Sequence, residues 1–299
     1  MCGIVGLFLK DAALEREFGA LFAGMLGVLS DRGPDSAGFA IYGRGELDAV
    51  KLTIRPPRGT DLAALARALE PAAGGVVEAR RRGSHAVLVV PATREQAVLA
   101  ALAARTPPVA LVSRGRRMEV YKEVGRPTEV TESFGLERMA GSHGIGHTRM
   151  ATESAVTTEG AHPFSTGRDQ CLVHNGSLSN HNAVRRELRR AGIAFETEND
   201  TEVAAGYLSW RMGQGASLAE ALQGAVGDLD GFYTFVVGTE SGFGVLRDPI
   251  ACKPAVMAET DRYVAFGTEY RALAALPGIE AARVWEPEPG RVYLWERAA

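Results

Sequence analysis

The chain has 299 residues, of which 46% are hydrophobic, and a formal net charge of -3. This composition is typical of a soluble globular protein of one or two domains, and it provides no general basic surface that would favour nucleic acid as a partner. No apolar run approaches the length of a membrane span, and the start does not resemble a signal peptide. We therefore expect a cytoplasmic protein with no membrane partner.

Three cysteines, Cys2, Cys171 and Cys252, lie far apart and form no CxxC motif. This spacing argues against disulfides, zinc and cysteine-ligated iron–sulfur clusters. We therefore expect no metal and no cofactor in this chain, so any redox cofactor would belong to a partner. We also expect Cys171 and Cys252 to lie in apolar strands.

The first stretch that could carry catalytic chemistry is the amino terminus, because removal of Met1 would make Cys2 the terminal residue. A terminal cysteine carries a thiol together with an α-amine of pKa about 8, which can accept the thiol proton. The following residues, 3–8, read as a buried strand. A cysteine in such a context can equally be a small buried hydrophobe, so the remainder of the chain has to decide.

Apolar side chains at helical spacing predict an amphipathic helix over residues 14–29. A polar turn at 31–38 then leads into a strand at 39–42. Within this turn, Arg32 and Asp35 have two interpretations of equal weight. They form a local ion pair, or they act near Cys2.

Residues 47–114 are predicted to be a separate unit, inserted into a main body made of residues 1–46 and 115–299. Periodicity predicts the order βαββαβ, typical of a ferredoxin-like unit, with elements at 50–54, 61–69, 76–80, 86–90, 94–104 and 109–112. The unit contains no pattern of catalytic residues, and we expect the isolated His85 to lie on the surface. Its expected role is contact with a partner or shielding of the site.

A strand is expected at 118–124, followed by a polar stretch to 135 and a strand that ends at Arg149. A guanidinium at the junction between a strand and a polar loop suits bidentate binding of a carboxylate. Residues 171–174 form a short strand that is expected to stop at Asn175 and Gly176. This pair is either a plain hairpin turn or two donors of an oxyanion hole.

Asp200 precedes a predicted helix that extends through Trp210. An aspartate at this place commonly caps the helix. Its carboxylate can also bind an ammonium group. Both interpretations remain open from the residues alone.

Six motifs together resemble the glutaminase domain of class II glutamine amidotransferases: CGIVG at 2–6, RGPDSAG at 32–38, GHTRMAT at 146–152, HPF at 162–164, HNGSLSN at 174–180 and NDTEV at 199–203. The resemblance covers nearly everything outside 47–140. It implies an α+β fold, the four-layer αββα sandwich of the N-terminal nucleophile (Ntn) hydrolases, here with the inserted βαββαβ unit.

The resemblance implies catalytic roles for three residues. Cys2 is the nucleophile, with its freed amine as the base, and Asn175 and the Gly176 N–H form the oxyanion hole. The implied reaction is hydrolysis of L-glutamine to glutamate and ammonia through a γ-glutamyl thioester.

Substrate binding is implied for four further residues. Arg149 would bind the α-carboxylate of glutamine and Asp200 its α-ammonium. Thr152 would belong to a lid over the substrate, and Arg32 would orient the terminal residue. Met150 departs from the family pattern, because sugar-phosphate amidotransferases have tryptophan at this position, so lid closure is expected to differ.

The family passes its ammonia to a synthase site, and we expect that site on a separate polypeptide. The chain most resembles the stand-alone amidotransferase subunit of glutamate-synthase-like complexes, including those of N-methylglutamate synthesis, whose other subunits carry flavin and iron–sulfur centres. Two alternatives are a non-catalytic, glutamine-binding regulatory subunit and an Ntn hydrolase that acts on another amide.

Overall fold

The structure is a computed structural model that describes residues 2–151 and 155–297. Its largest sheet contains, in spatial order, β15 (Arg283–Trp285), β13 (Val256–Glu259), β14 (Tyr263–Gly267), β1 (Gly3–Leu9), β8 (His143–Arg149), β2 (Ser36–Tyr42) and β7 (Met118–Val124). A second sheet contains β16 (Val292–Glu296), β12 (Gly242–Arg247), β11 (Gly231–Gly238), β10 (Gln170–Leu178) and β9 (Phe164–Gly167). Neighbouring strands in both sheets are antiparallel.

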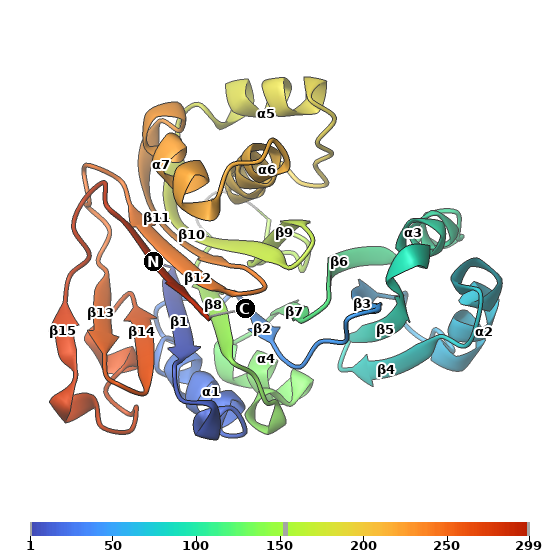
Figure 1. The fold of residues 1–299 in the computed structure, drawn as a ribbon, viewed down its shortest axis with the longest axis horizontal. Coiled ribbons are helices and arrows are strands. Elements are labelled where there is room, and N and C mark those ends of the chain that lie inside the picture. Colours follow the sequence, from blue (N-terminus) through green and yellow to red (C-terminus); the bar gives the residue numbers. More distant parts are fainter. Residues whose placement is uncertain (1, 152–154, 298–299) are drawn as a thin grey trace.

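The two sheets stack face to face between helices, which gives four layers (Figure 1). Alternation along β1 explains the packing, because side chains of a strand point alternately to its two faces. Ile4 and Phe8 join the cluster between the sheets, which includes Val236 and Phe243 of the second sheet. Val5 joins the cluster on the opposite face.

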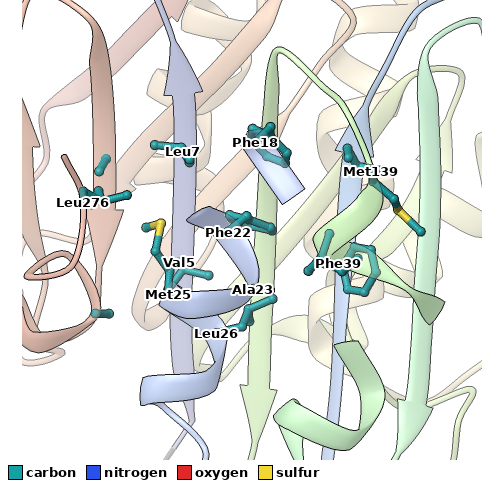
Figure 2. Close-up of a cluster of buried hydrophobic side chains, with 14 of the residues drawn as sticks. Val5, Leu7, Phe18, Phe22, Ala23, Met25, Leu26, Phe39, Met139 and Leu276 are labelled. Carbon is teal, nitrogen blue, oxygen red and sulfur yellow. The ribbon is translucent and has the colours of Figure 1, made fainter. Parts of the chain in front are cut away.

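The outer face of the large sheet is covered by α1 (Phe18–Val28) and α4 (Pro127–Phe134). Phe18, Phe22 and Leu26 recur at a spacing of four residues and are fully buried against the sheet. Figure 2 shows this stripe of α1 beside Val5 and Leu7 of β1. The helix begins later than predicted, because a short 3₁₀ turn, η1 (Ala12–Leu14), comes first.

The outer face of the second sheet is covered by α5 (His181–Arg190), α6 (Asp200–Gly213) and α7 (Leu218–Asp228). Short 3₁₀ turns occur at η2 (Ala92–Arg94), η3 (Leu136–Arg138), η4 (Tyr270–Ala272) and η5 (Ile279–Ala281). Within the described ranges, no helix has both the length and the apolar character needed to cross a membrane.

A third sheet contains β4 (Glu78–Arg82), β5 (His85–Pro91), β3 (Ala49–Arg55) and β6 (Ala110–Gly115), all antiparallel. With α2 (Leu62–Ala73) and α3 (Glu95–Ala103) it follows the order βαββαβ and forms a unit beside the main body, here called the 49–115 unit (Figure 1). Both helices pack on one face of its sheet around Leu52, Leu69 and Val98.

The other face of this sheet packs on the main body, and this contact corrects one expectation. His85 is fully buried, not at the surface, and its ring lies edge-on to Phe134 with the centroids 5.0 Å apart. Val87 joins the same apolar cluster as α1 and α4. The solitary histidine is therefore part of the contact between the unit and the body.

Two other expectations are corrected by the structure. The polar stretch before residue 135 contains α4, which starts with Pro127 in its first turn and buries Val130 and Phe134 four residues apart. Cys252 is exposed in the segment between β12 and β13, outside any strand, whereas Cys171 is buried in β10.

Candidate active site

Cys2 lies at the start of β1, where the ends of several strands meet. Because β1 and β8 are antiparallel and Gly3 pairs with Thr148, the beginning of β1 adjoins the end of β8. The Cys2 carbonyl oxygen accepts hydrogen bonds from Arg32 Nε at 2.8 Å and from Asn175 Nδ2 at 3.3 Å. Its half-buried thiol lies 3.8 Å from the carbonyl oxygen of Met150.

Arg32 connects this residue to the far end of the sequence. Its Nη1 forms an ion pair with Glu269, which follows β14, and its Nε contacts Cys2, so Arg32 acts near Cys2. Asp35 instead accepts a hydrogen bond from the Ala151 backbone N–H at 2.8 Å. Strand β1 is anchored next to this pair, because the Ile4 N–H donates to Thr268 Oγ1 at 2.8 Å.

Asn175 and Gly176 do not form a hairpin turn, because β10 continues through both to Leu178. Gly176 has φ of 152°, in the region that favours glycine. A Cβ here would lie 2.0 Å from the Phe232 carbonyl oxygen and 2.9 Å from His174 Nε2. The turn interpretation was therefore wrong, and glycine is required by close packing within a strand pair.

Arg149 is the last residue of β8, and only 6% of its surface is exposed. Its Nη1 donates to the Ala155 carbonyl oxygen at 3.3 Å. The strand ladder fixes its backbone, since Arg149 pairs with Ser36 of β2. A buried guanidinium carried by a fixed backbone suits recognition of a carboxylate.

Asp200 is the first residue of α6, but it does not cap the helix. The cap is Asn199, whose side chain accepts from the Thr201 N–H at 2.9 Å. Asp200 instead accepts from the Leu178 N–H at 3.0 Å, and His174 Nδ1 lies 3.6 Å away. Burial alone would raise the pKa of Asp200, but interactions with His174 and Leu178 outweigh burial and lower this pKa to about 2. The carboxylate is thus anionic and available to a cation.

Three buried histidines lie behind Asn175 and Asp200. His147 and His162 stack with ring centroids 4.0 Å apart, and burial lowers both pKa values, that of His147 to about 3. His147 Nε2 donates to the His174 carbonyl oxygen at 3.1 Å, because a carbonyl can only accept. Thr201 Oγ1 lies 2.6 Å from His162 Nε2 and 3.0 Å from His174 Nδ1.

The Thr201 hydroxyl has one proton, so at least one of these two imidazoles must donate to it. The three rings therefore form a hydrogen-bonded support for the strand that carries Asn175. This support is rigid, because each ring is fixed by a backbone or hydroxyl partner.

A pocket of about 270 Å³ brings these groups together. Its lining comprises Cys2, Arg149, Met150, Ala151, His162, His174, Asn175, Gly176, Asn199, Asp200, Thr201 and Lys253. Of the residues predicted to act, five line this pocket and Arg32 lies against Cys2. Thr152 lies outside the described residues. The volume suits a small ligand.

The chain is similar to several known proteins. A model described as a glutamine amidotransferase domain matches residues 147–275. The glutamine amidotransferase-like protein GlxB of Rhizobium meliloti (strain 1021) is 62% identical over 297 residues, which cover 99% of this chain and 98% of that protein. This chain belongs to the class II glutamine amidotransferases. Membership places it among enzymes of glutamine hydrolysis.

A second relative of this amidotransferase is a putative glutamine amidotransferase of Methanothermobacter thermautotrophicus, which is 34% identical over 99% of this chain and 100% of that protein. The solved structure of glutamine phosphoribosylpyrophosphate amidotransferase from B. subtilis superposes with a TM-score of 0.63 at 19% identity, over 99% of this chain and 47% of that one. This likeness concerns the fold, and it confirms the predicted α+β Ntn-type architecture.

Several residues of the amidotransferase pocket carry no sequence-based role. Lys253 lines the pocket, and its Nζ lies 5.0 Å above the Phe232 ring. His162 and Thr201 line its inner side, and Glu269 holds Arg32. Of these residues, His162 and Thr201 stand within the six motifs, and that was the available signal for them, whereas Lys253, Glu269 and Phe232 lie outside these motifs. Their partners are distant in sequence, which is why no role could be derived from spacing.

Proposed function

We propose that this amidotransferase hydrolyses L-glutamine with Cys2 as the nucleophile once Met1 is removed. One observation supports this most strongly: Cys2, Arg149, Asn175, Gly176 and Asp200 come from four distant segments and line a single pocket. Arg149 supplies a cation for the α-carboxylate and Asp200 an anion for the α-ammonium.

In the proposed reaction, the freed α-amine of Cys2 accepts the thiol proton and the thiolate attacks the carboxamide carbon of glutamine. The tetrahedral oxyanion is stabilised by Asn175 Nδ2 and the Gly176 N–H. The protonated amine then gives its proton to the leaving nitrogen, the C–N bond breaks, and ammonia departs. Water hydrolyses the remaining thioester, with the amine again as base, and releases glutamate.

The contacts of the Cys2 carbonyl oxygen leave a donor of Asn175 for the oxyanion. Asn175 Nδ2 donates one hydrogen to this carbonyl, and because an amide nitrogen carries two N–H groups, the second can stabilise an oxyanion. Arg32 Nε donates to the same carbonyl at 2.8 Å. We therefore assign Arg32 the role of holding Cys2 in place together with Asn175.

The test is release of glutamate from glutamine by protein whose intact mass shows that Met1 is absent. Cys2→Ser should reduce the rate by about a hundredfold or more, because the nucleophile is lost. Cys252→Ser, which removes an exposed thiol outside any strand, should retain the rate. Full activity of Cys2→Ser would refute the proposal, and calorimetric binding of glutamine without turnover would favour a regulatory subunit.

We further propose that the ammonia is delivered to a separate synthase subunit of a glutamate-synthase-like or N-methylglutamate synthase complex. Support comes from the two relatives matched over 98% and 100% of their length, in contrast to the phosphoribosylpyrophosphate enzyme matched over 47%. Flavin and iron–sulfur centres would then belong to the synthase subunits. Co-purification from the source organism followed by mass spectrometry tests this; recovery of the chain with no synthase subunit would contradict it.

A further inference from the structure

The short turn that precedes β2 is hydrogen-bonded to the segment that follows Arg149. The Asp35 N–H donates to the Arg149 carbonyl oxygen at 3.1 Å, and the Asp35 carboxylate accepts from the Ala151 N–H at 2.8 Å. These two bonds enclose Met150 from both sides. Strand β8 ends at Arg149, so its ladder does not extend to the next two residues.

The turn itself is fixed against both of its neighbours. A Cβ on Gly33 would lie 2.4 Å from the Thr148 carbonyl carbon and 2.6 Å from the Arg149 nitrogen, so only glycine allows this approach. On the other side, the Asp35 carbonyl oxygen accepts from the Gly125 N–H at 3.0 Å. Asp35 is therefore held rigidly while it holds Met150.

The enclosed residue touches the nucleophile. The Met150 carbonyl oxygen lies 3.8 Å from Cys2 Sγ, and Arg149, Met150 and Ala151 all line the pocket. The orientation of this peptide therefore sets both the environment of the thiol and the point from which the Arg149 side chain departs. Asp35 does not line the pocket, so it acts through these residues and not on the substrate.

We propose that Asp35 is a positioning residue of this site, which holds the Arg149–Ala151 backbone so that Arg149 meets the substrate carboxylate and the Met150 carbonyl meets the Cys2 thiol. The kinetic part of this inference rests on the proposed hydrolysis of glutamine. The part that concerns the thiol does not, and it can be measured without any substrate.

The kinetic experiment compares Asp35→Ala with Asp35→Asn, because asparagine keeps an oxygen that can accept from the Ala151 N–H. Asp35→Ala should raise KM for glutamine about tenfold and leave kcat within about threefold, as expected when a charge-assisted bond that orients a binding group is lost. Asp35→Asn should restore KM to within about threefold of wild type. The matched control is Asp31→Ala, which removes an exposed aspartate of the same turn.

A double variant sharpens the result. If Asp35 acts through Arg149, the KM effect of Asp35→Ala should largely disappear in an Arg149→Lys background. Full additivity of the two effects would overturn the inference. So would an unchanged KM in Asp35→Ala, or an Asp35→Asn variant as impaired as Asp35→Ala.

The second readout is the rate at which iodoacetamide alkylates Cys2, followed by peptide mass spectrometry with Cys252 as the internal reference. The Met150 carbonyl oxygen lies against Cys2 Sγ at 3.8 Å, so loss of this alignment should uncover the thiol and increase the alkylation rate of Cys2 about threefold or more in Asp35→Ala. An equal rate in wild type and Asp35→Ala would overturn the inference. If wild type fails to hydrolyse glutamine, the proposed function fails while this alkylation result still decides the role of Asp35.

Discussion

The main body and the 49–115 unit differ most in what they bury. The body buries polar groups beside the Cys2 pocket, including His147, His162, His174, Asn175 and Thr201. The core of the unit, by contrast, is built from apolar side chains such as Leu52, Leu69 and Val98. Buried polar groups are costly unless they are paired, so a concentration of them marks the region that is selected for chemistry and not only for stability.

Cavity size alone would have pointed elsewhere. Larger cavities, of about 640 Å³ and 450 Å³, lie where the unit meets the body, whereas the Cys2 pocket measures about 270 Å³. The larger of these is lined by charged groups that pair with one another. For example, Lys51 Nζ lies 2.8 Å from Glu119 Oε1. Convergence of a nucleophile, donors and two opposite charges identifies a site better than its volume does.

The largest expected effect is on catalysis, and it should distinguish alanine substitutions at two glycines with positive φ, one in the body and one in the unit. Gly176→Ala should lower glutaminase kcat/KM about a hundredfold, because the new Cβ would collide with the Phe232 carbonyl and displace the proposed oxyanion donor. The comparison variant is Gly59→Ala in the unit. Gly59 has φ of 78°, but a Cβ added there would meet no atom within 4 Å. This substitution should cost only about 1 kcal/mol of stability and leave kinetics unchanged. Steady-state kinetics and thermal melts check both, and similar kinetic losses would remove the contrast.

Two aspartates at helix starts give the next largest effect. Asp200→Asn should raise KM for glutamine more than tenfold, equivalent to about 2 kcal/mol, because the substrate ammonium loses its charged partner. Asp61 caps α2 by accepting from the Ala63 and Ala64 N–H groups, and asparagine caps equally well. Asp61→Asn should therefore change neither KM nor melting temperature. An unchanged KM in Asp200→Asn would mean that this carboxylate has only a structural role.

The loss of stability in acid can be compared for two buried histidines. His85 lies at the contact between the unit and the body, and His143 lies inside the body. Burial lowers the pKa of His85 to about 4 and that of His143 to about 3, well below about 6.5 in the unfolded chain. The unfolded state thus binds more protons, so stability falls as pH drops from 6.5 towards these values.

Each of these histidines should cost about 2 kcal/mol between pH 7 and pH 5. His85→Phe should remove one such contribution, and denaturant unfolding at both pH values measures it. An unchanged pH slope in His85→Phe would mean that His85 can be protonated in place.

The smallest kinetic effect is expected on the outer surface of the unit, which we propose contacts a partner. Replacing Arg67 and Arg81 by glutamate should leave basal hydrolysis within about twofold, because neither lines the pocket. The same change should weaken binding to the synthase subunits in a pull-down. Loss of hydrolysis without loss of binding would assign the unit to support of the site. Excision of the unit is less informative, since it would uncover the Phe134 contact.

The sequence predicted most elements because their apolar spacing is regular. Strand β7 matches its predicted range of 118–124, and the βαββαβ order of the unit appears in its strands and helices. Helix α4 was missed because only Val130 and Phe134 of its large apolar residues face inward, too few for a periodic signal. The continuous strand through Asn175 and Gly176 was missed because this dipeptide is a common turn signal, and only its cross-strand partners reveal the close packing.

The candidate site was predictable as a set of motifs but not as a network. Sequence order identified Cys2, Arg149 and Asp200, whereas their supports depend on contacts across the fold. Glu269 reaches Arg32 across more than two hundred residues, and Asn199, not Asp200, caps the helix. Distances of this kind follow from sheet order, which local periodicity does not encode.

The position of β1 in its sheet has a consequence for biosynthesis. This first strand pairs on one side with β14, with Val5 opposite Gly267. Arg32, which contacts Cys2, forms its ion pair with Glu269, just after β14. A ribosome must therefore release nearly the whole chain before the strand behind Cys2 can be completed. Under the proposed function, Cys2 could not act on glutamine before this strand is in place. The order of synthesis would then separate maturation of the proposed nucleophile from its use.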